Sequence, residues 1–114
     1  MQLIDSHCHL NLKEFDGDAA EAVERARLAG VKKMVVVGTD LDDSIRALEL
    51  AHQYDSVFAA IGIHPHNTQS ATESDYKRLL AMAGDRKIAA YGEIGLDFYR
   101  DHSPKPVQRR EFAR

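Results

Sequence analysis

The sequence lacks the residues and runs that mark several classes of protein. It contains one cysteine and no tryptophan, and a single thiol cannot form an internal disulfide, which fits a reducing compartment. It also lacks any apolar run of the roughly 20 residues that a membrane-spanning helix needs, and its N-terminus does not have the pattern of a signal peptide. We therefore expect a cytoplasmic protein with no membrane partner.

An excess of positive charge is also missing. The 15 lysine and arginine residues are outnumbered by 18 aspartate and glutamate residues, which gives a formal charge of −3 at pH 7. No global basic field would draw in nucleic acid, so any phosphate-binding chemistry has to come from a local site or from bound cations. The composition, 44% hydrophobic and 29% charged, is that of an ordinary globular domain.

Four apolar runs predict strands, at residues 2–6, 33–38, 57–63 and 88–94. Each is apolar at successive positions rather than at alternate ones, which is typical of strands buried on both faces of a parallel sheet. Between them, helices are predicted over residues 18–29, 42–54 and 72–83. Asp18 and Glu21 have the spacing of a capping box, and Asp42 is expected to cap the second helix.

The alternation of predicted strands and helices is typical of parallel βαβ units. A doubly wound nucleotide-binding sheet would carry a glycine-rich loop after its first strand, where this chain has His-Cys-His instead. A (β/α)₈ barrel places its chemistry at the carboxyl ends of its strands and needs about 250 residues. We predict an α/β fold in which residues 1–114 are the N-terminal part of a single barrel domain, with about the first four of eight strands. We also expect the chain to stop inside a fourth helix that follows the two prolines Pro104 and Pro106.

Two histidines stand one residue apart at the end of the first predicted strand. In an extended chain His7 and His9 point to the same face, about 6.6 Å apart along the strand, and Cys8 points to the other. Two imidazoles on one face suit a divalent metal, although two polar side chains at a strand end can also simply be hydrogen-bonded there. Asp5 shares this face and can either fix the tautomer of a ligating histidine or bind backbone amides. Cys8 is expected to pack in the core.

The third predicted strand ends in "GIHPH", residues 62–66. Pro65 stops the ladder, so we expect His64 to be held near the strand axis and His66 to lie further out. His64 can ligate a metal, contact an anionic substrate oxygen, or be a solvated loop residue. We assign His52, in the second predicted helix, to packing or solvent, and His102 to solvent.

Glu93 is the most informative residue of the fourth predicted strand, which ends in "GEIGLDFYR", residues 92–100. An ionised carboxylate inside an apolar strand is costly unless it is paired or binds a cation. Its two oxygens can bridge two cations, or hold one while orienting a water, as metal-assisted hydrolysis requires. Asp97 can be a ligand, the partner of a ligand, or a cap. Tyr99 and Arg100 can present a phosphate-binding edge or be ordinary surface groups.

Three strand ends thus each offer a type of metal ligand. The ordered set "DSHCHL", "GIHPH" and "GEIGLDFYR" resembles the TatD family of metal-dependent hydrolases, deoxyribonucleases with an amidohydrolase-like TIM barrel. The resemblance implies that His7 and His9 ligate one divalent metal and that Glu93 ligates or bridges the metals and acts in catalysis. It also implies that His64 lies near the scissile phosphate, where it serves catalysis and substrate binding. The implied cofactor is Mg²⁺, with Mn²⁺ or Zn²⁺ as alternatives and two ions in the complete protein.

The implied activity is 3′ to 5′ exonuclease hydrolysis of DNA at single-stranded ends. The resemblance covers about the first half of such a protein, and the family takes two further histidine ligands and an aspartate from later strands. Two other hypotheses stay open: an amidohydrolase-like enzyme acting on a lactone or amide, since a first-strand His-x-His is shared across that superfamily, and a non-catalytic fragment. We expect the complete protein to be monomeric. Residues 1–114 alone are expected to be poorly soluble or to self-associate through two open sheet edges.

Overall fold

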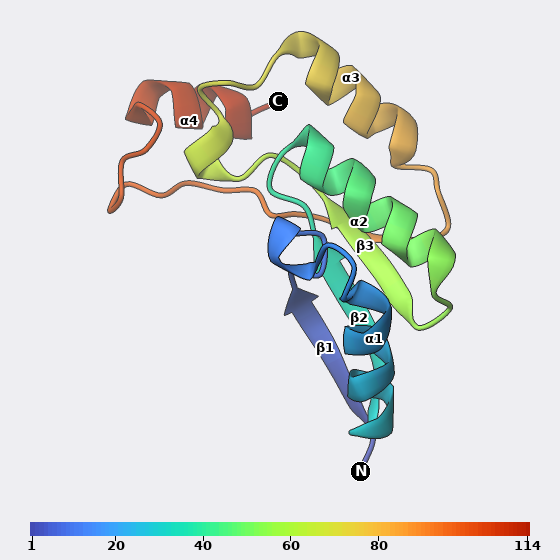
Figure 1. Ribbon diagram of the computed structural model, residues 1–114. Coiled ribbons are helices and arrows are strands. Elements are labelled where there is room, and N and C mark those ends of the chain that lie inside the picture. The colour runs from blue at the N-terminus through green and yellow to red at the C-terminus, as the bar shows by residue number, and fades with distance from the viewer.

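The computed structural model describes residues 1–114 and is built on one four-stranded sheet (Figure 1). The strands are β1 (Leu3–Cys8), β2 (Val31–Val37), β3 (Val57–Ile61) and β4 (Ile88–Tyr91). All pairings are parallel, and the strand order in the sheet, β1-β2-β3-β4, is the order in the chain. The predicted arrangement of parallel strands with intervening helices is therefore confirmed.

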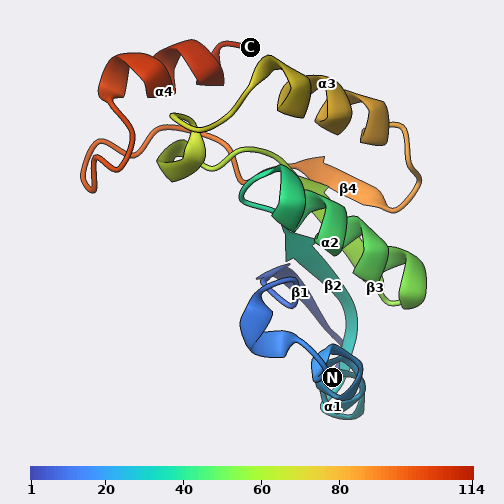
Figure 2. The same ribbon diagram turned by 45° about the horizontal axis from the view of Figure 1, so that its top comes forward.

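The helices lie outside this sheet. They are α1 (Ala19–Leu28), α2 (Leu41–Gln53), α3 (Glu73–Met82) and α4 (Lys105–Phe112), and short 3₁₀ turns occupy Lys13–Phe15 and Pro65–Asn67. The first three helices cover one face of the sheet, and α4 lies near the carboxyl ends of the strands (Figures 1 and 2). None of the helices is both long enough and apolar enough to span a lipid bilayer.

The core lies between the sheet and the first three helices. Alternate residues of β2 and β3 point toward the helices, are almost fully buried, and pack against α1 and α2. A second buried cluster joins the end of β3 to α2 and α3. The packed residues are Val23, Met34, Val36, Ala47, Ala51, Val57 and Ala59 in the first cluster and Leu41, Ile61, Ile63 and Leu79 in the second. Because α2 presents alanines to the sheet, it can lie close against β3.

The two outer strands do not share this burial. We expected all four strands to be buried on both faces, but β1 is exposed along most of its length, and so are three of the four residues of β4. Ile4 is 68% exposed and Tyr91 is 57% exposed. The reason is that β1 and β4 form the edges of the sheet, so each pairs on one side only and has no neighbour to cover the other.

Two strand ends differ from the predicted ones in a way that matters for the candidate site. β1 continues to Cys8, so His7 belongs to the strand. β4 ends at Tyr91 rather than at residue 94, so Glu93 follows the strand instead of lying in its interior. The amide of Gly92 donates to the carbonyl of Ile61 at 2.9 Å, and the amide of Glu93 donates to the carbonyl of Gly38 at 3.0 Å. The chain therefore leaves the ladder here, and Glu93 stands at the rim of the sheet.

Two expected helix caps were wrong. Asp18 precedes α1, but its carboxylate makes no capping bond and pairs with Arg25 at 3.0 Å. Asp40, rather than Asp42, caps α2 by accepting a hydrogen bond from the amide of Asp43 at 2.8 Å. The guanidinium of Arg25 competes with the helix amides for the Asp18 carboxylate, and charge-assisted hydrogen bonds are the stronger ones.

Asp40→Ala is expected to lower the free energy of unfolding by about 1 kcal/mol, because an amide in the first turn of α2 loses its acceptor. Asp42→Ala is the matched control, and it should cost about 0.3 kcal/mol through its weaker interaction with the helix dipole. Urea unfolding followed by circular dichroism measures both losses. Equal losses in the two variants would contradict the assignment of the cap to Asp40.

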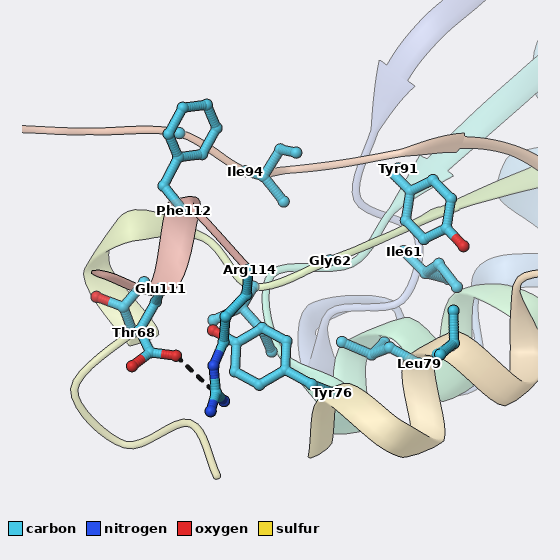
Figure 3. A pocket seen from close by; sticks show the side chains of 13 residues that line it. Ile61, Gly62, Thr68, Tyr76, Leu79, Tyr91, Ile94, Glu111, Phe112 and Arg114 are labelled. Atoms are coloured by element: carbon cyan, nitrogen blue, oxygen red, sulfur yellow. Dashed lines mark ion pairs between the residues drawn. The ribbon is translucent and has the colours of Figure 1, made fainter. Parts of the chain in front are cut away.

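An apolar groove of about 360 Å³ opens between β4, α3 and α4 (Figure 3). Ile61, Leu79 and Tyr91 line it, and Glu111 and Arg114, whose side chains are 3.5 Å apart, flank it on the α4 side. None of the histidines and acids that the sequence marks as candidate site residues lines this groove. The groove continues the exposed apolar edge of β4 and is separate from the polar residues at the carboxyl ends of the strands.

Candidate metal centre

Side chains from the two edge strands meet at the carboxyl end of the sheet. His7 lies near the end of β1, His9 comes directly after it, and Glu93 follows β4. The Nε2 atoms of His7 and His9 are 3.1 Å apart, and Nε2 of His7 is 3.6 Å from Oε2 of Glu93. One ligand atom from each of the three residues lies within 4.8 Å of those of the other two. The curl of the sheet thus brings together residues from its first and last strands.

The ring of His9 is held by the main chain of the neighbouring strand. Its Nδ1 lies 3.1 Å from the carbonyl oxygen of Val37, the last residue of β2. Because a carbonyl can only accept, Nδ1 carries the proton and Nε2 keeps its lone pair, on the side of His7 and Glu93. The buried side chain of Asn11 donates to the same carbonyl at 3.0 Å. A fixed tautomer with a free Nε2 is what a metal-ligating histidine requires.

Asp5 and Cys8 do not join the donors. Oδ1 of Asp5 accepts a hydrogen bond from the backbone amide of His7 at 3.1 Å, so its carboxylate follows the backbone-binding alternative, and the carbonyl of Val37 fixes a tautomer instead. The Sγ atom of Cys8 is 3.5 Å from the carbonyl of Val35 and packs against the core. Burial, together with the nearby Asp5, raises the pKa of the Cys8 thiol to about 11. The thiol is therefore protonated at neutral pH.

His64 approaches the other oxygen of Glu93. It follows β3, and its backbone amide donates to the carbonyl of Thr39 at 2.8 Å. Its Nδ1 accepts from the amide of His66 at 3.0 Å, so the neutral ring carries its proton on Nε2, 3.5 Å from Oε1 of Glu93. Burial lowers the pKa of His64, and the carboxylate of Glu93 offsets only part of that effect. His64 is therefore a neutral hydrogen-bond donor beside the three possible ligands.

The two histidine donors are spaced to share one divalent cation, and the nearest oxygen of Glu93, 3.6 Å from Nε2 of His7, lies slightly further away than ligands of one ion do. Two ligand atoms about 2.1 Å from one ion, at tetrahedral or octahedral angles, lie roughly 3.0 to 3.4 Å apart. The separation of 3.1 Å between the Nε2 atoms of His7 and His9 falls in that range. Imidazole suits Zn²⁺, and carboxylate with water suits Mg²⁺ and Mn²⁺, so the mixed set does not by itself select the ion. Three protein donors also leave coordination positions for water or substrate.

Asp97 binds the main chain of its own loop and the ring of His66. Its Oδ1 accepts from the amides of Tyr99 and Arg100, both at 3.0 Å, and its Oδ2 is 2.6 Å from Nε2 of His66. The Arg100 amide first, and then the His66 ring, hold the pKa of Asp97 at about 2. The carboxylate is thus engaged as a turn cap and as the partner of a histidine, and not as a member of the three-donor cluster.

The side chains of Tyr99 and Arg100 lie on the surface. Tyr99 is 94% exposed, and the exposed side chain of Arg100 makes no hydrogen bond or ion pair within the chain. Both are available to a ligand at the loop that follows β4. The structure does not join them to the cluster of His7, His9 and Glu93.

Three buried polar residues that support the loops of the site were not predicted from the sequence. They are Asn11, Ser103 and Gln108, each at most 1% exposed. Their burial depends on the path of the loops, which no local spacing reveals. His66 had a signal that could have been used, because it forms a second His-x-His with His64. His52 lies apart from the site and pairs with Asp85 at 2.8 Å.

Comparison with known protein families complements this geometry. The family model described as "TatD related DNase" matches residues 4–114. The chain belongs to the TatD-related DNase family. Among its curated relatives, the uncharacterized metal-dependent hydrolase YabD of Bacillus subtilis is 41% identical over 110 residues, which cover 96% of this chain and 43% of the relative. The 3′-5′ ssDNA/RNA exonuclease TatD of Cronobacter sakazakii is 36% identical over 97% of this chain and 42% of the relative.

Solved structures of TatD proteins have the same fold. YjjV, a TatD homolog from Escherichia coli, superposes with a TM-score of 0.87 at 34% identity, covering 97% of this chain and 44% of that one. A TatD family hydrolase from Entamoeba histolytica superposes with a TM-score of 0.89 at 26% identity, covering 99% of this chain and 44% of that one. The predicted partial TIM barrel is confirmed. The chain spans less than half the length of the curated TatD relatives it matches.

Proposed function

We propose that residues 1–114 supply part of the catalytic site of a metal-dependent hydrolase that cleaves the phosphodiester bonds of DNA. The proposed reaction is the removal of nucleotides from the 3′ ends of single strands, within a single barrel domain of which this chain is the N-terminal portion. The observation that carries the proposal is the convergence of His7, His9 and Glu93 within 4.8 Å at the rim of the sheet. The name of the Cronobacter relative, an exonuclease, supports the substrate class.

The contacts suggest how the chain would hold a cation. His7 and His9 would each bind the cation through Nε2, and the ring of His9 is already turned by its bond to the carbonyl of Val37. Glu93 offers one oxygen near His7 and the other near His64. When bound, a divalent cation polarises a phosphoryl oxygen, lowers the pKa of bound water, and supplies positive charge that this acidic chain lacks. We take Mg²⁺ as the ion, with Mn²⁺ or Zn²⁺ as alternatives and two ions in the complete protein.

Other residues would act on the substrate. The neutral ring of His64 carries its proton on Nε2 and could donate it in a hydrogen bond to a phosphate oxygen near Glu93. The exposed side chains of Tyr99 and Arg100 would contact the nucleic-acid backbone, since a guanidinium can bind phosphate through two hydrogen bonds. Asp97 would keep that loop in shape through the two amides it accepts from.

The nuclease proposal is tested with the longest polypeptide that the gene containing residues 1–114 encodes. We expect Mg²⁺- or Mn²⁺-dependent release of nucleotides from 3′-labelled single-stranded DNA, abolished by EDTA and by Glu93→Gln. His52→Ala, which alters a histidine outside the site, should leave the release unchanged. If no nucleotide is released with either metal, the nuclease proposal is wrong. Hydrolysis of a lactone or amide instead would assign the site to a different substrate class.

Residues 1–114 expressed alone are expected to self-associate, because both β1 and β4 leave one side unpaired and expose apolar side chains such as Ile4 and Tyr91. Two copies related by a twofold axis along the barrel could pair β4 of each with β1 of the other and close an eight-stranded ring. Sedimentation equilibrium measures the mass. A soluble, well-folded monomer across the accessible concentration range would contradict this expectation.

A further inference from the structure

One buried side chain fastens α4 to the loop that follows β4. Gln108 is fully buried, although glutamine usually lies on the surface. Its Oε1 accepts from the amide of Asp97 at 2.8 Å, and its Nε2 donates to the carbonyls of Asp97 at 3.0 Å and Ser103 at 2.7 Å. Two of these hydrogen bonds fix the amide and the carbonyl of Asp97, and the third fixes the carbonyl of Ser103.

Asp97 and Ser103, both bound by Gln108, in turn bind residues of the loop that follows β3. The hydroxyl of Ser103, also fully buried, donates to the carbonyl of His66 at 2.8 Å and accepts from the amide of Gln69 at 3.1 Å. Oδ2 of Asp97 lies 2.6 Å from Nε2 of His66. His66 is thus held at its backbone by one residue and at its ring by another, and both of these residues bind Gln108.

His66 in turn holds His64. Its amide donates to Nδ1 of His64 at 3.0 Å, and the two rings meet edge to face with their centroids 4.2 Å apart. An acceptor at Nδ1 places the proton of a neutral His64 on Nε2, the atom that lies 3.5 Å from Glu93. An unbroken series of contacts therefore runs from the inside of α4 to the candidate metal centre.

The way α4 is attached distinguishes positioning from simple packing. The buried residues of α4 are Gln108 and Glu111, so no apolar side chain of this helix is fully buried. Apolar contacts are non-directional, whereas hydrogen bonds fix both distance and angle. A helix that is attached through polar bonds to three backbone groups of one loop determines where that loop lies.

We propose that Gln108 is a positioning residue of the candidate site, which fixes the orientation and tautomer of His64 through Asp97, Ser103 and His66. The proposal rests on the proposed function for the role of His64 near the substrate, whereas the contacts themselves can be tested without any reaction. The helix that follows the fourth strand would thereby align a substrate-contacting residue carried by the third.

The test is nuclear magnetic resonance of the longest polypeptide that the gene containing residues 1–114 encodes. It is recorded at about pH 8, where a histidine with an ordinary pKa is neutral. The variants are Gln108→Leu and Ser103→Ala, with Leu79→Ala as a control that destabilises the core without touching the network. In the first two we expect the ¹⁵N signals of the His64 ring to move toward those of a mixture of tautomers. Exchange of the His66 amide should also become roughly tenfold faster than in a Leu79→Ala chain of equal stability. Leu79→Ala should leave the ring signals in place.

Unchanged His64 ring signals in Gln108→Leu and Ser103→Ala, with stability lowered as in the control, would overturn the proposal and leave Gln108 a purely structural residue. If Gln108→Leu does not fold, Ser103→Ala decides alone, because it removes one hydroxyl and retains Gln108. Binding of Zn²⁺ separates this proposal from the proposed function. Gln108→Leu should bind Zn²⁺ like the unaltered chain, and an unaltered chain that binds no Zn²⁺ would count against the metal centre without affecting the result for His64.

Discussion

Replacing His9 with alanine is expected to weaken the binding of Zn²⁺ to the polypeptide used in the nuclease test by more than roughly 100-fold. Loss of a residue that only supports a ligand typically costs 10- to 100-fold in affinity, and His9 offers the donor atom itself. The variant retains His7 and Glu93, whose nearest atoms are 3.6 Å apart, and two donors hold a cation much less firmly than three. Isothermal titration calorimetry with Zn²⁺ as the probe measures the change.

His52→Ala is the matched control for this measurement, because it removes a partly exposed histidine that also has a carboxylate partner, Asp85 at 2.8 Å. It should change the Zn²⁺ affinity of the unaltered chain by less than about twofold, because a substitution at a distant site usually has little effect on another site. If both variants lose affinity equally, the ion binds histidines without preference and the assignment of the centre to His7, His9 and Glu93 is wrong.

Gly38→Ala is expected to lower the free energy of unfolding by about 3 kcal/mol or more, the upper range for overpacking. A Cβ at this position would lie 2.6 Å from Cα and 2.8 Å from N of Ser44, so the first turn of α2 would have to move. Ser44 accepts a hydrogen bond from the amide of Gly62 at 3.2 Å, and the carbonyl of Gly38 accepts from the amide of Glu93. The strain therefore spreads to three strand ends, and urea unfolding measures it.

Gly84→Ala provides the comparison for Gly38→Ala, because a Cβ there would meet nothing within 4 Å and the residue lies between α3 and β4 without a positive φ. We expect a change of less than about 0.5 kcal/mol, or a slight gain from a less flexible unfolded chain. A loss at Gly38 no larger than that at Gly84 would mean that α2 can shift away from the strand end at little cost.

The fold was predictable because its signals are local. Apolar runs separated by helical periods specify parallel βαβ units, and the strands and helices lie within a few residues of their predicted positions. The burial of the strands was not predictable from the same runs, because the sequence of a strand does not show whether it has a neighbouring strand on both sides. The exposure of Ile4 and Tyr91 follows from their place at the edges of the sheet.

The candidate site was predictable only in part, for the same kind of reason. The types and order of His7, His9 and Glu93 could be read from the sequence, and their place at strand ends follows from the parallel sheet. The group that turns the ring of His9 is a backbone carbonyl, and every residue has one, so nothing in the sequence singles out Val37. The role of Gln108 likewise depends on the path of the loop between β4 and α4.

The order of strands in the sheet has a further consequence, for how the protein is made. Because β1, β2, β3 and β4 pair in the order in which they leave the ribosome, each of the last three finds its preceding partner already synthesised. The three candidate metal ligands are synthesised at different times, because His7 and His9 emerge with β1 and Glu93 emerges only after β4. A three-donor centre would therefore exist only once the fourth strand has docked. A cation bound there would mark the four-stranded sheet as assembled. By mass action it would also stabilise that sheet relative to its partly assembled precursors.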